Sequence, residues 1–572
     1  MPEKLRIGVM AASSGSVEGW EAYILSELSL DPNIEWTVIL QHKEPMSAAS
    51  ALADRIKRKW RRIPAGLALR FMERVDELAG RSAYPSIGKF QVDERYPLPD
   101  LLPGVPVLHV TPNESASRLV QRFDEETIKT IREYQLDLLI RFGFKILRGK
   151  ILSAARFGIV SYHHADNRVN RGGPCGFWEV YNDLGQTGST LQVLTEELDS
   201  GTVIKRGIYP THRFSWAGNR RRLRATSTLL MIDAIRELAR ERRWCPLPDP
   251  RPLSVYAHPL YVNPGFRDSL TFLGKLAGRS LKHVGSRIFS IRQWRILYQV
   301  GPAPSQGVEP PAPANLILWK FKQLVPPRGR FYADPFLCWR DGKLYLFVED
   351  FSRATGKAVI SWLEWMGKEW KYGGVALDCP YHLSYPFVFE HQGRVFMIPE
   401  SYASRRVELW EAEEFPGRWK LARVLLDNVR AVDSTILAKD GSLYLFTNLD
   451  RSETHDPGTE LHIYSIPDLL NGTLCPHARN PVIQDCRVAR NAGGFFTDSQ
   501  GRLIRAAQIN SSGYGEGLVF REVKRLTSEE YEEETLETVL PQWEPGLEGM
   551  HHTHFAQGSI VMDSLHRVQR FF

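Results

Sequence analysis

A hairpin pattern that recurs about every 50 residues places the tightest limit on what this chain can fold into. Each repeat has an apolar run, a turn containing glycine and a second apolar run. A small sheet that recurs at this spacing is typical of propeller blades, because each blade buries its faces against its neighbours. Five repeats predict an all-β five-bladed propeller over 292–572, completed by the strand-like segment QWRILYQV that begins at Gln293. The repeats start at Ala333, Ser384, Val432, Asn491 and Met550.

Equivalent positions of the repeats are expected to converge, because the innermost strand of every blade lines the channel of a propeller. Converging carboxylates, amides and cations are typical of sugar binding, and a pair of carboxylates can also serve as acid and base in glycoside hydrolysis. A third possible role for these polar residues is only to close the channel. The segment HHTH lacks a clear carboxylate partner in the sequence, so no metal site is predicted. The predicted channel residues are Asp334, Glu349, His382, Tyr385, Glu400, Asp433, Arg490, Arg505, Gln508 and His551.

Apolar runs alternate with helical patterns through the first 244 residues. The runs LRIGVMAA, EWTVILQHK, VPVLHV, LDLLIRFGFKIL and FGIVSYHH predict buried strands, with helical spacing in GWEAYILSELSL and ETIKTIREYQ between them. This alternation predicts a Rossmann-like α/β domain with a parallel sheet over 1–244. Ligand sites in such sheets lie at the carboxyl ends of strands. The polar segment SYHHADNRVNRGGP follows the last of these runs and is therefore the candidate site.

An ordered set of motifs extends from this segment in both directions. The pieces are DLLIRFGFKIL, SYHHAD, RGGPCGFW, GQTGSTLQVL and LDSGTVI. Their order resembles the formyltransferase family that uses 10-formyltetrahydrofolate, over roughly residues 5–240. The resemblance implies that His163 is the catalytic histidine and Asp199 its acid. It also implies that Arg141, Phe142 and Gly143 line the folate pocket.

Ser161 stands where that family has an asparagine. An amine that attacks a formyl carbon generates an oxyanion, which a side-chain amide and an imidazolium can stabilise by donating hydrogen bonds. The serine side chain is shorter than that of asparagine, so its hydroxyl reaches less far as a hydrogen-bond donor. Loss of one oxyanion donor lowers the rate about 10²–10³-fold. Either Ser161 or a neighbour (His164 or Asn167) substitutes for the amide, or the reaction differs or is lost. The further predicted pocket residues are His164, Asp166, Asn167 and Arg171.

A proline-rich connector and a basic amphipathic helix are predicted between the two halves, over 245–291. The segment CPLPDPRPLSVYAHPLYVNP is typical of an extended connector, and apolar residues from Leu270 to Ile288 have helical spacing. Seven basic residues between Arg267 and Arg295 face one acid, Asp268. Such a helix can lie on an anionic membrane surface, here through 266–295, or can simply pack between domains.

A second resemblance covers most of residues 330–525. The pieces ADPF, YLFVED, HLSYPFVFE, MIPES, NPV, ARNAG, RAAQ and SGYGEG resemble the N-terminal propeller domain of the glucosamine inositolphosphorylceramide transferase family. A separate transferase domain follows in that family, and the resemblance does not extend to it. Glycosyl transfer is therefore not carried over to this chain by the resemblance.

Several function classes are disfavoured by composition. A net charge of +7 on 572 residues, with basic residues gathered mainly in the connector, disfavours nucleic-acid binding. The six cysteines include no CxxC pair, which disfavours a zinc or redox motif. No run reaches the roughly 18 apolar residues that span a bilayer. We therefore expect a cytoplasmic protein, with peripheral attachment to the inner face of the membrane as an alternative.

The two halves together predict a transferase. The expected reaction is formyl transfer from 10-formyltetrahydrofolate to an amino group of a sugar or glycolipid-linked saccharide, in cell-envelope polysaccharide biosynthesis. One alternative is a glycoside hydrolase or glycosyl-transferring enzyme that uses the propeller carboxylates. The other is a non-catalytic glycan-binding scaffold with a degenerate formyltransferase domain. The acceptor, the donor and the oligomeric state stay open at this point.

Overall fold

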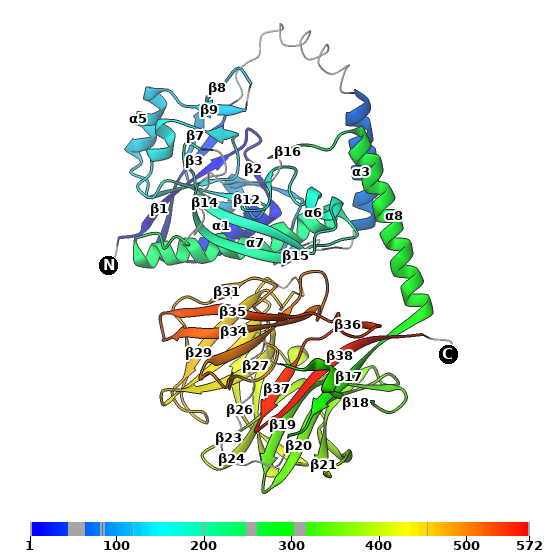
Figure 1. The fold of residues 1–572 in the computed structure, drawn as a ribbon. Coiled ribbons are helices and arrows are strands. Elements are labelled where there is room, and N and C mark those ends of the chain that lie inside the picture. Colours follow the sequence, from blue (N-terminus) through cyan, green and yellow to red (C-terminus); the bar gives the residue numbers. More distant parts are fainter. Residues whose placement is uncertain are drawn as a thin grey trace. The chain divides into compact units, whose positions relative to one another are not determined.

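The chain divides into two compact units, which are described separately (Figure 1). One comprises residues 1–282 with 452–454, and the other comprises 283–451 with 455–572. The division falls inside the predicted connector. The computed structural model describes residues 3–43, 63–80, 83, 86–117, 119–197, 201–247, 260–301, 316–452, 454 and 456–569.

The first unit is built on a seven-stranded sheet in the order β7-β3-β1-β10-β12-β14-β15. The first five of these strands are parallel, as predicted, and in chain order they are arranged 3-2-1-4-5. In a doubly wound sheet this order creates a crevice between β1 and β10, where the strand order reverses. The strands are β1 (Leu5–Ala11), β3 (Ile34–His42), β7 (Val107–Val110), β10 (Leu138–Arg141), β12 (Ile159–His163), β14 (Gln186–Val193) and β15 (Thr202–Pro210).

Two further strands, whose direction was not predicted, extend this sheet in the antiparallel sense. β14 pairs antiparallel with β12, and β15 pairs antiparallel with β14. Antiparallel neighbours need no crossover helix, which is why the chain passes directly from β14 to β15. Short ribbons complete the unit: β2 (Ser16–Glu18) with β6 (Arg95–Pro97), β4 (Ser86–Ile87) with β5 (Phe90–Gln91), β8 (Asn113–Glu114) with β9 (Val120–Arg122) and β11 (Ile146–Leu147), and β13 (Arg171–Gly172) with β16 (Leu260–Tyr261).

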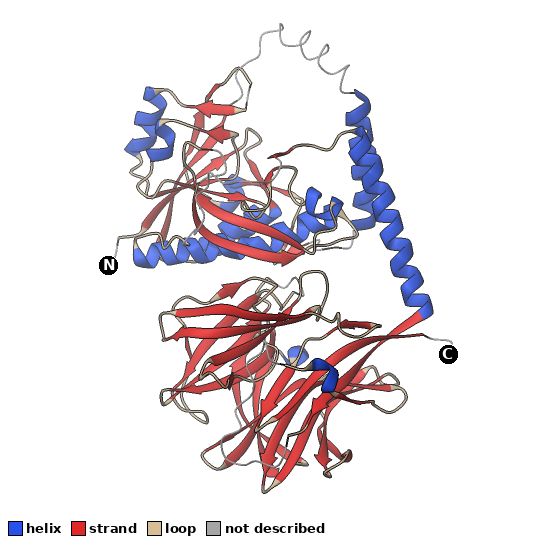
Figure 2. Ribbon diagram, viewed as in Figure 1, coloured by secondary structure: helices blue, strands red, loops and turns tan. Residues whose placement is uncertain are grey.

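Helices cover both faces of this sheet (Figure 2). Trp20 and Ile24 of α1 and Ile232 of α7 share an apolar cluster with one face, and Ile128 of α5 shares a second cluster with the other. The helices of the unit are α1 (Gly19–Leu28), α3 (Ile63–Gly80), α4 (Leu98–Leu101), α5 (Glu125–Glu133), the 3-10 turn η1 (Lys150–Ser153), α6 (Phe177–Tyr181) and α7 (Trp216–Glu241).

The predicted basic helix is α8 (Phe266–Phe289), and it ends earlier than 295. Arg292 and Arg295 lie on the next strand, β17. Phe272 and Leu276 are buried in a cluster with Phe177 of α6, so part of the apolar face packs on the first unit. The large apolar residues of α8 that remain exposed are Phe266, Leu270, Leu281, Val284, Ile288 and Phe289.

Five antiparallel sheets make up the described part of the second unit. All five predicted hairpins are present as antiparallel strand pairs. Gln293 lies on β17, which pairs with the last strand β38 over ten residues. The first sheet contains β17 (Ser290–Gln299), β18 (Lys322–Leu324), β36 (Leu547–Gly549), β37 (Thr553–Ala556) and β38 (Ser559–Gln569), and the second contains β19 (Arg330–Arg340), β20 (Lys343–Ser352), β21 (Lys357–Trp365) and β22 (Trp370–Leu377). The third sheet contains β23 (Ser384–His391), β24 (Arg394–Glu400), β25 (Arg406–Glu414) and β26 (Arg418–Asp427), and the fourth contains β27 (Ala431–Lys439), β28 (Ser442–Leu449), β29 (Glu460–Ile466), β30 (Cys475–Pro476) and β31 (Ile483–Gln484). The fifth sheet contains β32 (Phe496–Thr497), β33 (Leu503–Ile509), β34 (Gly517–Leu526) and β35 (Tyr531–Val539). Two 3-10 turns, η4 (Leu318–Lys320) and η5 (Tyr402–Ser404), precede β18 and β25.

Apolar clusters lie between successive sheets of this unit. Each sheet shares a cluster with the next one along the chain, and the fifth shares one with the first. These clusters contain Ile296 with Leu346, Phe347 with Met397, Phe396 with Leu445, Phe446 with Val523, and Phe520 with Met562. Burial of both faces of each sheet is what the apolar runs of the repeats require.

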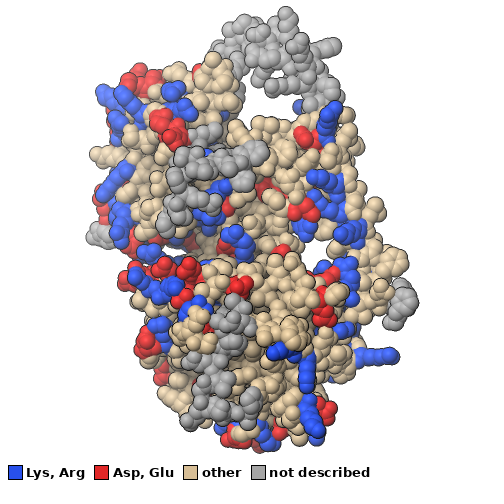
Figure 3. Space-filling view, viewed as in Figure 1, with Lys and Arg blue, Asp and Glu red and all other residues tan. Residues whose placement is uncertain are grey.

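Charge is mixed on the protein surface. On the face drawn in Figure 3, acidic and basic side chains are interspersed. None of the described helices has both the length and the apolar character that crossing a bilayer requires.

Candidate functional site

The carboxyl ends of β10 and β12 lie side by side in the first unit and carry the predicted site. Arg141 ends β10 and His163 ends β12. A cavity of about 50 Å³ opens at this edge. Asp199, the predicted acid, lies outside the described residues. The residues that line the cavity include Arg141, Ser161, Gln192, Thr195, Glu197 and Gly201.

His163 is buried, with 9% of its surface exposed. Its Nε2–H donates a hydrogen bond of 2.9 Å to the carbonyl oxygen of Asn170. This contact selects the tautomer that carries the proton on Nε2 and the lone pair on Nδ1. Protonation of Nδ1 would make the ring the imidazolium that the sequence leads us to expect as a hydrogen-bond donor to the oxyanion, and a neutral ring held in this way could accept that proton from the substrate.

Ser161 points to the same face of the sheet as His163, since the two residues are two positions apart on one strand. Ser161 is buried and its hydroxyl donates only a long bond of 3.4 Å, to the carbonyl of Tyr162. The residue directly opposite on β14 is Gln192. Gln192 is 3% exposed, and its Oε1 is buried without a hydrogen-bond partner. Gln192 was not predicted as a site residue, because its position opposite Ser161 follows only from the antiparallel pairing of β12 with β14.

His164 is directed away from His163. Its ring stacks on Tyr162 with 5.0 Å between centroids and meets Trp20 edge-on at 5.1 Å. Burial, aided by the nearby charge of Arg224, lowers the pKa of His164 to about 3. His164 is therefore neutral at physiological pH and packs against aromatic rings.

Asp166 and Asn167 are held by arginines. The carboxylate of Asp166 accepts hydrogen bonds of 2.7–3.2 Å from Arg168 and lies 3.6 Å from Arg206. Burial alone would raise the pKa of Asp166, but the hydrogen bonds and charge of Arg168 lower it. Asn167 accepts a bond from Arg206 at its Oδ1 and one from Arg171 at its carbonyl, while its buried Nδ2 has no partner. These residues shape the loop after β12.

Phe142 and Gly143 close the crevice between β1 and β10. Both backbone N–H groups donate to the carbonyl of Met10, at 3.0 and 2.9 Å. A Cβ on Gly143 would lie 2.3 Å from the backbone nitrogen of Ala12, so only glycine fits this approach. Phe142 packs on Trp20. Of the three residues predicted to bind folate, Arg141 alone is among the residues that line the cavity.

The lining of the cavity suits one edge of a polar heterocycle such as the pterin of a folate. Arg141 offers donors, and the orphaned Gln192 Oε1 offers an acceptor. The volume of about 50 Å³ is well below the roughly 300–1,000 Å³ of pockets that enclose a small molecule. The described cavity therefore has room for one edge of such a ring or for a small polar group, and does not enclose a folate.

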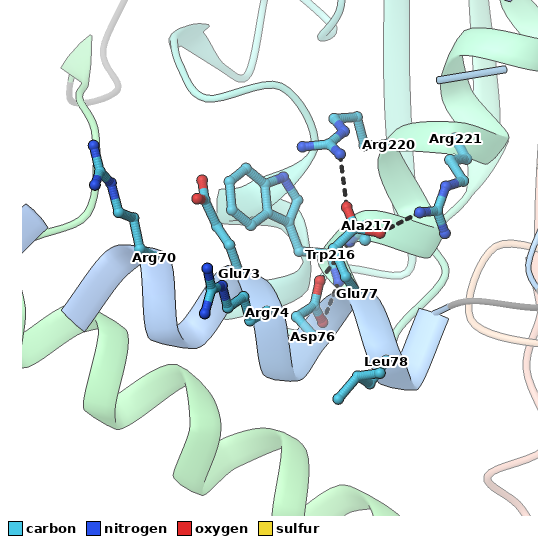
Figure 4. A pocket seen from close by; sticks show the side chains of 10 residues that line it. All are labelled: Arg70, Glu73, Arg74, Asp76, Glu77, Leu78, Trp216, Ala217, Arg220 and Arg221. Carbon is cyan, nitrogen blue, oxygen red and sulfur yellow. Dashed lines mark hydrogen bonds and ion pairs between the residues drawn. The ribbon is translucent and has the colours of Figure 1, made fainter. Parts of the chain in front are cut away.

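A larger cavity of about 670 Å³ lies between α3 and α7 (Figure 4). Asp76 on α3 is 1% exposed and accepts hydrogen bonds from the backbone nitrogens of Trp216 and Ala217, at 3.0 and 2.6 Å. It thereby caps the first turn of α7 together with Ser215. Glu77 pairs with Arg220 at 2.9 Å and also with Arg221. These ion pairs fasten α3 to α7.

In the second unit, three predicted channel residues adopt the same unusual backbone. Asp334, Tyr385 and Asp433 have φ of +49°, +45° and +48°, and the strand register shifts beside each one. A left-handed bulge costs about 1–3 kcal/mol for a residue other than glycine, and such strain gathers at functional sites. Its recurrence at one repeat position shows that the fold holds these three side chains in a defined orientation.

Asp334 and His551 belong to a buried chain of charges. His551 lies 3.2 Å from Asp334 through Nε2 and 2.7 Å from Asp563 through Nδ1. Asp563 also accepts bonds from the backbone nitrogens of His551 and His552. The ligand atoms of Asp334, His551 and Asp563 all lie within 4.8 Å of one another, so the histidine segment does have the carboxylate partners that its sequence lacks nearby.

The same chain of charges predicts how the stability of this unit depends on pH. Burial would lower the pKa of His551, but Asp563 and Asp334 hold it well above its usual 6.5. Asp334 is held at a pKa of about 2, because His551 outweighs the effect of burial. The histidine contribution is complete below pH 6.5 and is lost as pH rises. The aspartate contribution is complete above pH 3.8 and is lost toward pH 2.

We expect the unfolding free energy of the second unit to fall above pH 6.5, by up to about 1.4 kcal/mol per pH unit from His551. Urea unfolding at pH 6 and pH 8 measures this slope. His551→Gln should flatten the slope in this range. An equal slope in the variant would show that His551 does not keep its proton.

A second group gathers around Asp433. Arg490 pairs with Asp433 at 2.5 Å and approaches Glu400 at 3.7 Å, and Gln508 donates to Asp433 at 2.8 Å. Burial and the neighbouring charge of Asp433 raise the pKa of Glu400 well above its usual value. Glu400 and Asp433 therefore form a buried carboxyl pair in which burial and the charge of Asp433 favour the neutral form of Glu400.

The other predicted channel residues have separate partners. Glu349 lies 3.4 Å from His382, and burial raises the pKa of Glu349 to about 6. Tyr385 is fully buried and its hydroxyl contacts Thr435 and the backbone of Gly493. Arg505 has other partners than the Asp433 group: it donates hydrogen bonds to Glu533, to the carbonyl of Val488 and to Asn491. Its contacts indicate a structural role.

Two aromatic residues that the sequence analysis did not single out lie beside these charges. Tyr514 is 52% exposed and stacks over the guanidinium of Arg490 at 4.9 Å. Its ring lies 4.9 Å from that of His551, which in turn lies 4.2 Å from Trp294. A Cβ on Gly515 would come within 3.0 Å of Trp294, so glycine lets the loop approach. The motif SGYGEG contained Tyr514, but nothing in it indicated this position.

Comparison with known proteins gives different results for the two units. Residues 322–555 match the family model described as glucosamine inositolphosphorylceramide transferase 1, N-terminal. The rice (Oryza sativa subsp. japonica) protein of that name is 34% identical over 209 residues, which is 36% of this chain and 28% of the relative. The chain thus spans little more than a quarter of the length of that relative.

The first unit has shorter matches. Methionyl-tRNA formyltransferase of Bacteroides fragilis is 34% identical over 82 residues, which is 14% of this chain and 25% of the relative. The crystal structure of glycinamide ribonucleotide transformylase 1 from Symbiobacterium toebii covers 42% of this chain and 91% of its own, at 19% identity and a TM-score of 0.28.

Proposed function

We propose that the first unit transfers a formyl group to an amino group of a sugar or glycolipid-linked saccharide, and that the second unit binds the saccharide. The observation that carries the proposal is that the buried His163 ends β12 one pleat beyond Ser161, which lines a polar cavity at the carboxyl ends of β10 and β12. The formyl donor would be 10-formyltetrahydrofolate, which supplies an activated one-carbon group. The short match to a formyltransferase supports this reaction class.

The residues at the strand ends suit each part of such a transfer. The acceptor nitrogen forms a bond to the formyl carbon, the bond from that carbon to the donor nitrogen breaks, and one proton passes from the acceptor to the donor nitrogen. His163 can take up that proton at Nδ1 while its Nε2–H stays bonded to Asn170. Arg141 can orient the donor, and the buried position of His163 limits access of water.

Formyl transfer is tested with the full chain, 10-formyltetrahydrofolate and a panel of amino sugars, with the formamide product followed by mass spectrometry. Calorimetry with the folate alone provides a second measurement. We expect binding of the folate and transfer to at least one amino sugar. Absence of folate binding would exclude this function and leave the two alternatives.

We further propose that the five sheets close into a five-bladed propeller with the saccharide site at the Asp334 and Asp433 groups. The support is the cluster shared by the fifth and first sheets, and the three recurrent bulges. Tyr514 offers an exposed ring beside these charges, and the apolar face of a pyranose packs well on such a ring.

Tyr514→Ala is expected to weaken saccharide binding about tenfold, since an aromatic contact contributes roughly 0.5–1.5 kcal/mol beyond area burial. Binding is measured by glycan-array screening followed by calorimetry with the best ligand. Tyr372→Ala is the matched control, because Tyr372 is similarly exposed (47%) on β22. Equal losses in both variants would rule out a specific role for Tyr514.

A second candidate function is glycoside-bond cleavage or glycosyl transfer by the second unit. It is favoured by the raised pKa of Glu400 beside Asp433, since a pair of carboxyl groups can divide acid and base roles between them. In that case Asp334→Asn and Glu400→Gln should abolish sugar release or transfer while His163→Ala remains active. The converse pattern supports formyl transfer.

We also propose peripheral attachment to an anionic membrane through the end of α8. Leu281, Val284 and Ile288 are 74%, 53% and 50% exposed at helical spacing, beside Lys282 and Arg287. The full chain should sediment with vesicles containing phosphatidylglycerol and not with neutral vesicles. Leu281→Asp combined with Ile288→Asp should abolish sedimentation, and persistence of binding would disprove this site.

A further inference from the structure

Gln192 lines the cavity at the ends of β10 and β12, and its amide oxygen has no hydrogen-bond partner. Its side chain is 3% exposed and its Oε1 has no hydrogen-bond partner, although a buried polar atom left unpaired costs about 1–3 kcal/mol. Such a cost is tolerated at sites where a ligand completes the bond. The amide and the hydroxyl of Ser161 line one cavity.

The sheet geometry aims both side chains at the same place. Ser161 and Gln192 are directly opposite in the antiparallel pair of β12 and β14, so they project to one face with Cβ atoms about 4.5–5.5 Å apart. His163 projects to that face one pleat farther along β12. On β14, Leu191 faces the helical cluster on the other side.

Gly201 leaves room for the amide. A Cβ at Gly201 would lie 3.1 Å from Gln192 Oε1 and 2.4 Å from the carbonyl of Val193. Any larger residue would displace the amide or the strand. The nitrogen and oxygen of an amide exchange places by a half-turn about one bond. Gln192 can therefore present either an acceptor or an N–H donor to a group in the cavity.

Other candidates for the donor role fit less well. His164 stacks on Tyr162 and meets Trp20, away from the cavity. Asn167 has an unpaired Nδ2, but its Oδ1 and carbonyl are fixed by Arg206 and Arg171, and it does not line the cavity.

We propose that the amide of Gln192, with Ser161, donates the hydrogen bond that stabilises negative charge on the formyl oxygen during transfer. The inference rests on the proposed formyl transfer. As the acceptor nitrogen bonds to the formyl carbon, an electron pair of the carbonyl moves to oxygen. It returns when the bond from that carbon to the donor nitrogen breaks. An N–H aimed at that oxygen strengthens as charge develops, so it acts on kcat more than on KM.

Gln192→Met tests the proposal, because it keeps the length of the side chain and removes the amide. Formyl-transfer kcat should fall about 10²–10³-fold with KM within threefold, as for loss of one oxyanion donor. The melting temperature should stay the same or rise, since a buried unpaired carbonyl is removed. Gln186→Met is the matched control: the same change at the other end of β14, outside the cavity lining.

Restoration provides a sharper test. Ser161→Asn in the Gln192→Met background moves an amide from β14 to β12 and should recover at least tenfold in kcat. Isotope-edited infrared spectra of the bound ¹³C-formyl carbonyl, recorded without acceptor, give a readout independent of turnover. The stretch should shift to higher frequency in Gln192→Met and return in the double variant.

The possible outcomes distinguish failure of the proposed formyl transfer from failure of the role of Gln192. A wild-type chain without formyl transfer would overturn the proposed function itself. An active wild type with Gln192→Met within threefold in kcat, or with only KM raised, would overturn the role of Gln192 and leave the function standing. A lowered melting temperature with no carbonyl shift would show that Gln192 is structural.

Discussion

His163→Ala should lower formyl transfer about 10³-fold while folate binding changes little. The imidazole is the one described group at the end of β12 that is fixed by a hydrogen bond and able to take up a proton. Proton transfer by a positioned side chain contributes about 10²–10⁴ in rate. The measurement is single-turnover product formation at saturating folate and amino sugar.

His163→Gln and His109→Ala are its controls. Glutamine can still donate to the Asn170 carbonyl but cannot accept a proton, so His163→Gln should be folded and equally inactive. His109 is an exposed histidine on β7, and His109→Ala should be fully active. Retained activity in His163→Gln would reject the base role.

Arg505→Leu should destabilise the second unit by about 3–5 kcal/mol, because it leaves one partner of a buried ion pair. Arg505 and Glu533 are 1% and 3% exposed at their side chains and make two bonds, of 2.7 and 2.8 Å. Burial would raise the pKa of Glu533, but Arg505 lowers it below its usual value. The loss is measured by urea unfolding, with hydrogen exchange in β33 to β35 to localise it.

The double variant Arg505→Met with Glu533→Leu should recover most of this stability. Apolar residues of similar volume can replace a buried ion pair without loss, whereas a single buried charge cannot be accommodated. Arg521 lies 2.8 Å from Glu533 and is 14% exposed, so it can turn to water when that partner is removed. A double variant as unstable as the single one would mean that packing dominates at Arg505, and that the charge contributes little.

The parts of the fold that follow local patterns were predictable. The five hairpins each follow from a run of apolar residues around a glycine turn, and β1, β3, β7, β10 and β12 from buried runs between helical spacings. The antiparallel direction of β14 and β15 was not, because a short apolar run has the same composition in either direction. The basic helix was expected to end by residue 291 and ends at Phe289, although the basic residues continue into β17.

Some residues of the candidate site could also be located from local sequence patterns. His163, Ser161 and Arg141 are found by motif order and strand ends, and the structure places them at one edge of the sheet. Asp334, Tyr385 and Asp433 share a repeat position and share a left-handed bulge. Asp563 stands at the end of the fifth repeat, where the first and second repeats also have acids, and comparison of repeat ends could have found it.

The sequence alone determined the kinds of sheet in each half, the repeat, and the strand end at which the candidate site lies. The tertiary structure alone decided that Gln192 faces Ser161, that Arg505 pairs with Glu533, and that Tyr514 lies over Arg490. The physical reason is the distance along the chain over which each kind of interaction acts. Periodicity and turn chemistry act within a few residues. Register, ion pairing and ring stacking depend on which distant segments pack together, and a one-residue slip in pairing would turn each side chain to the other face.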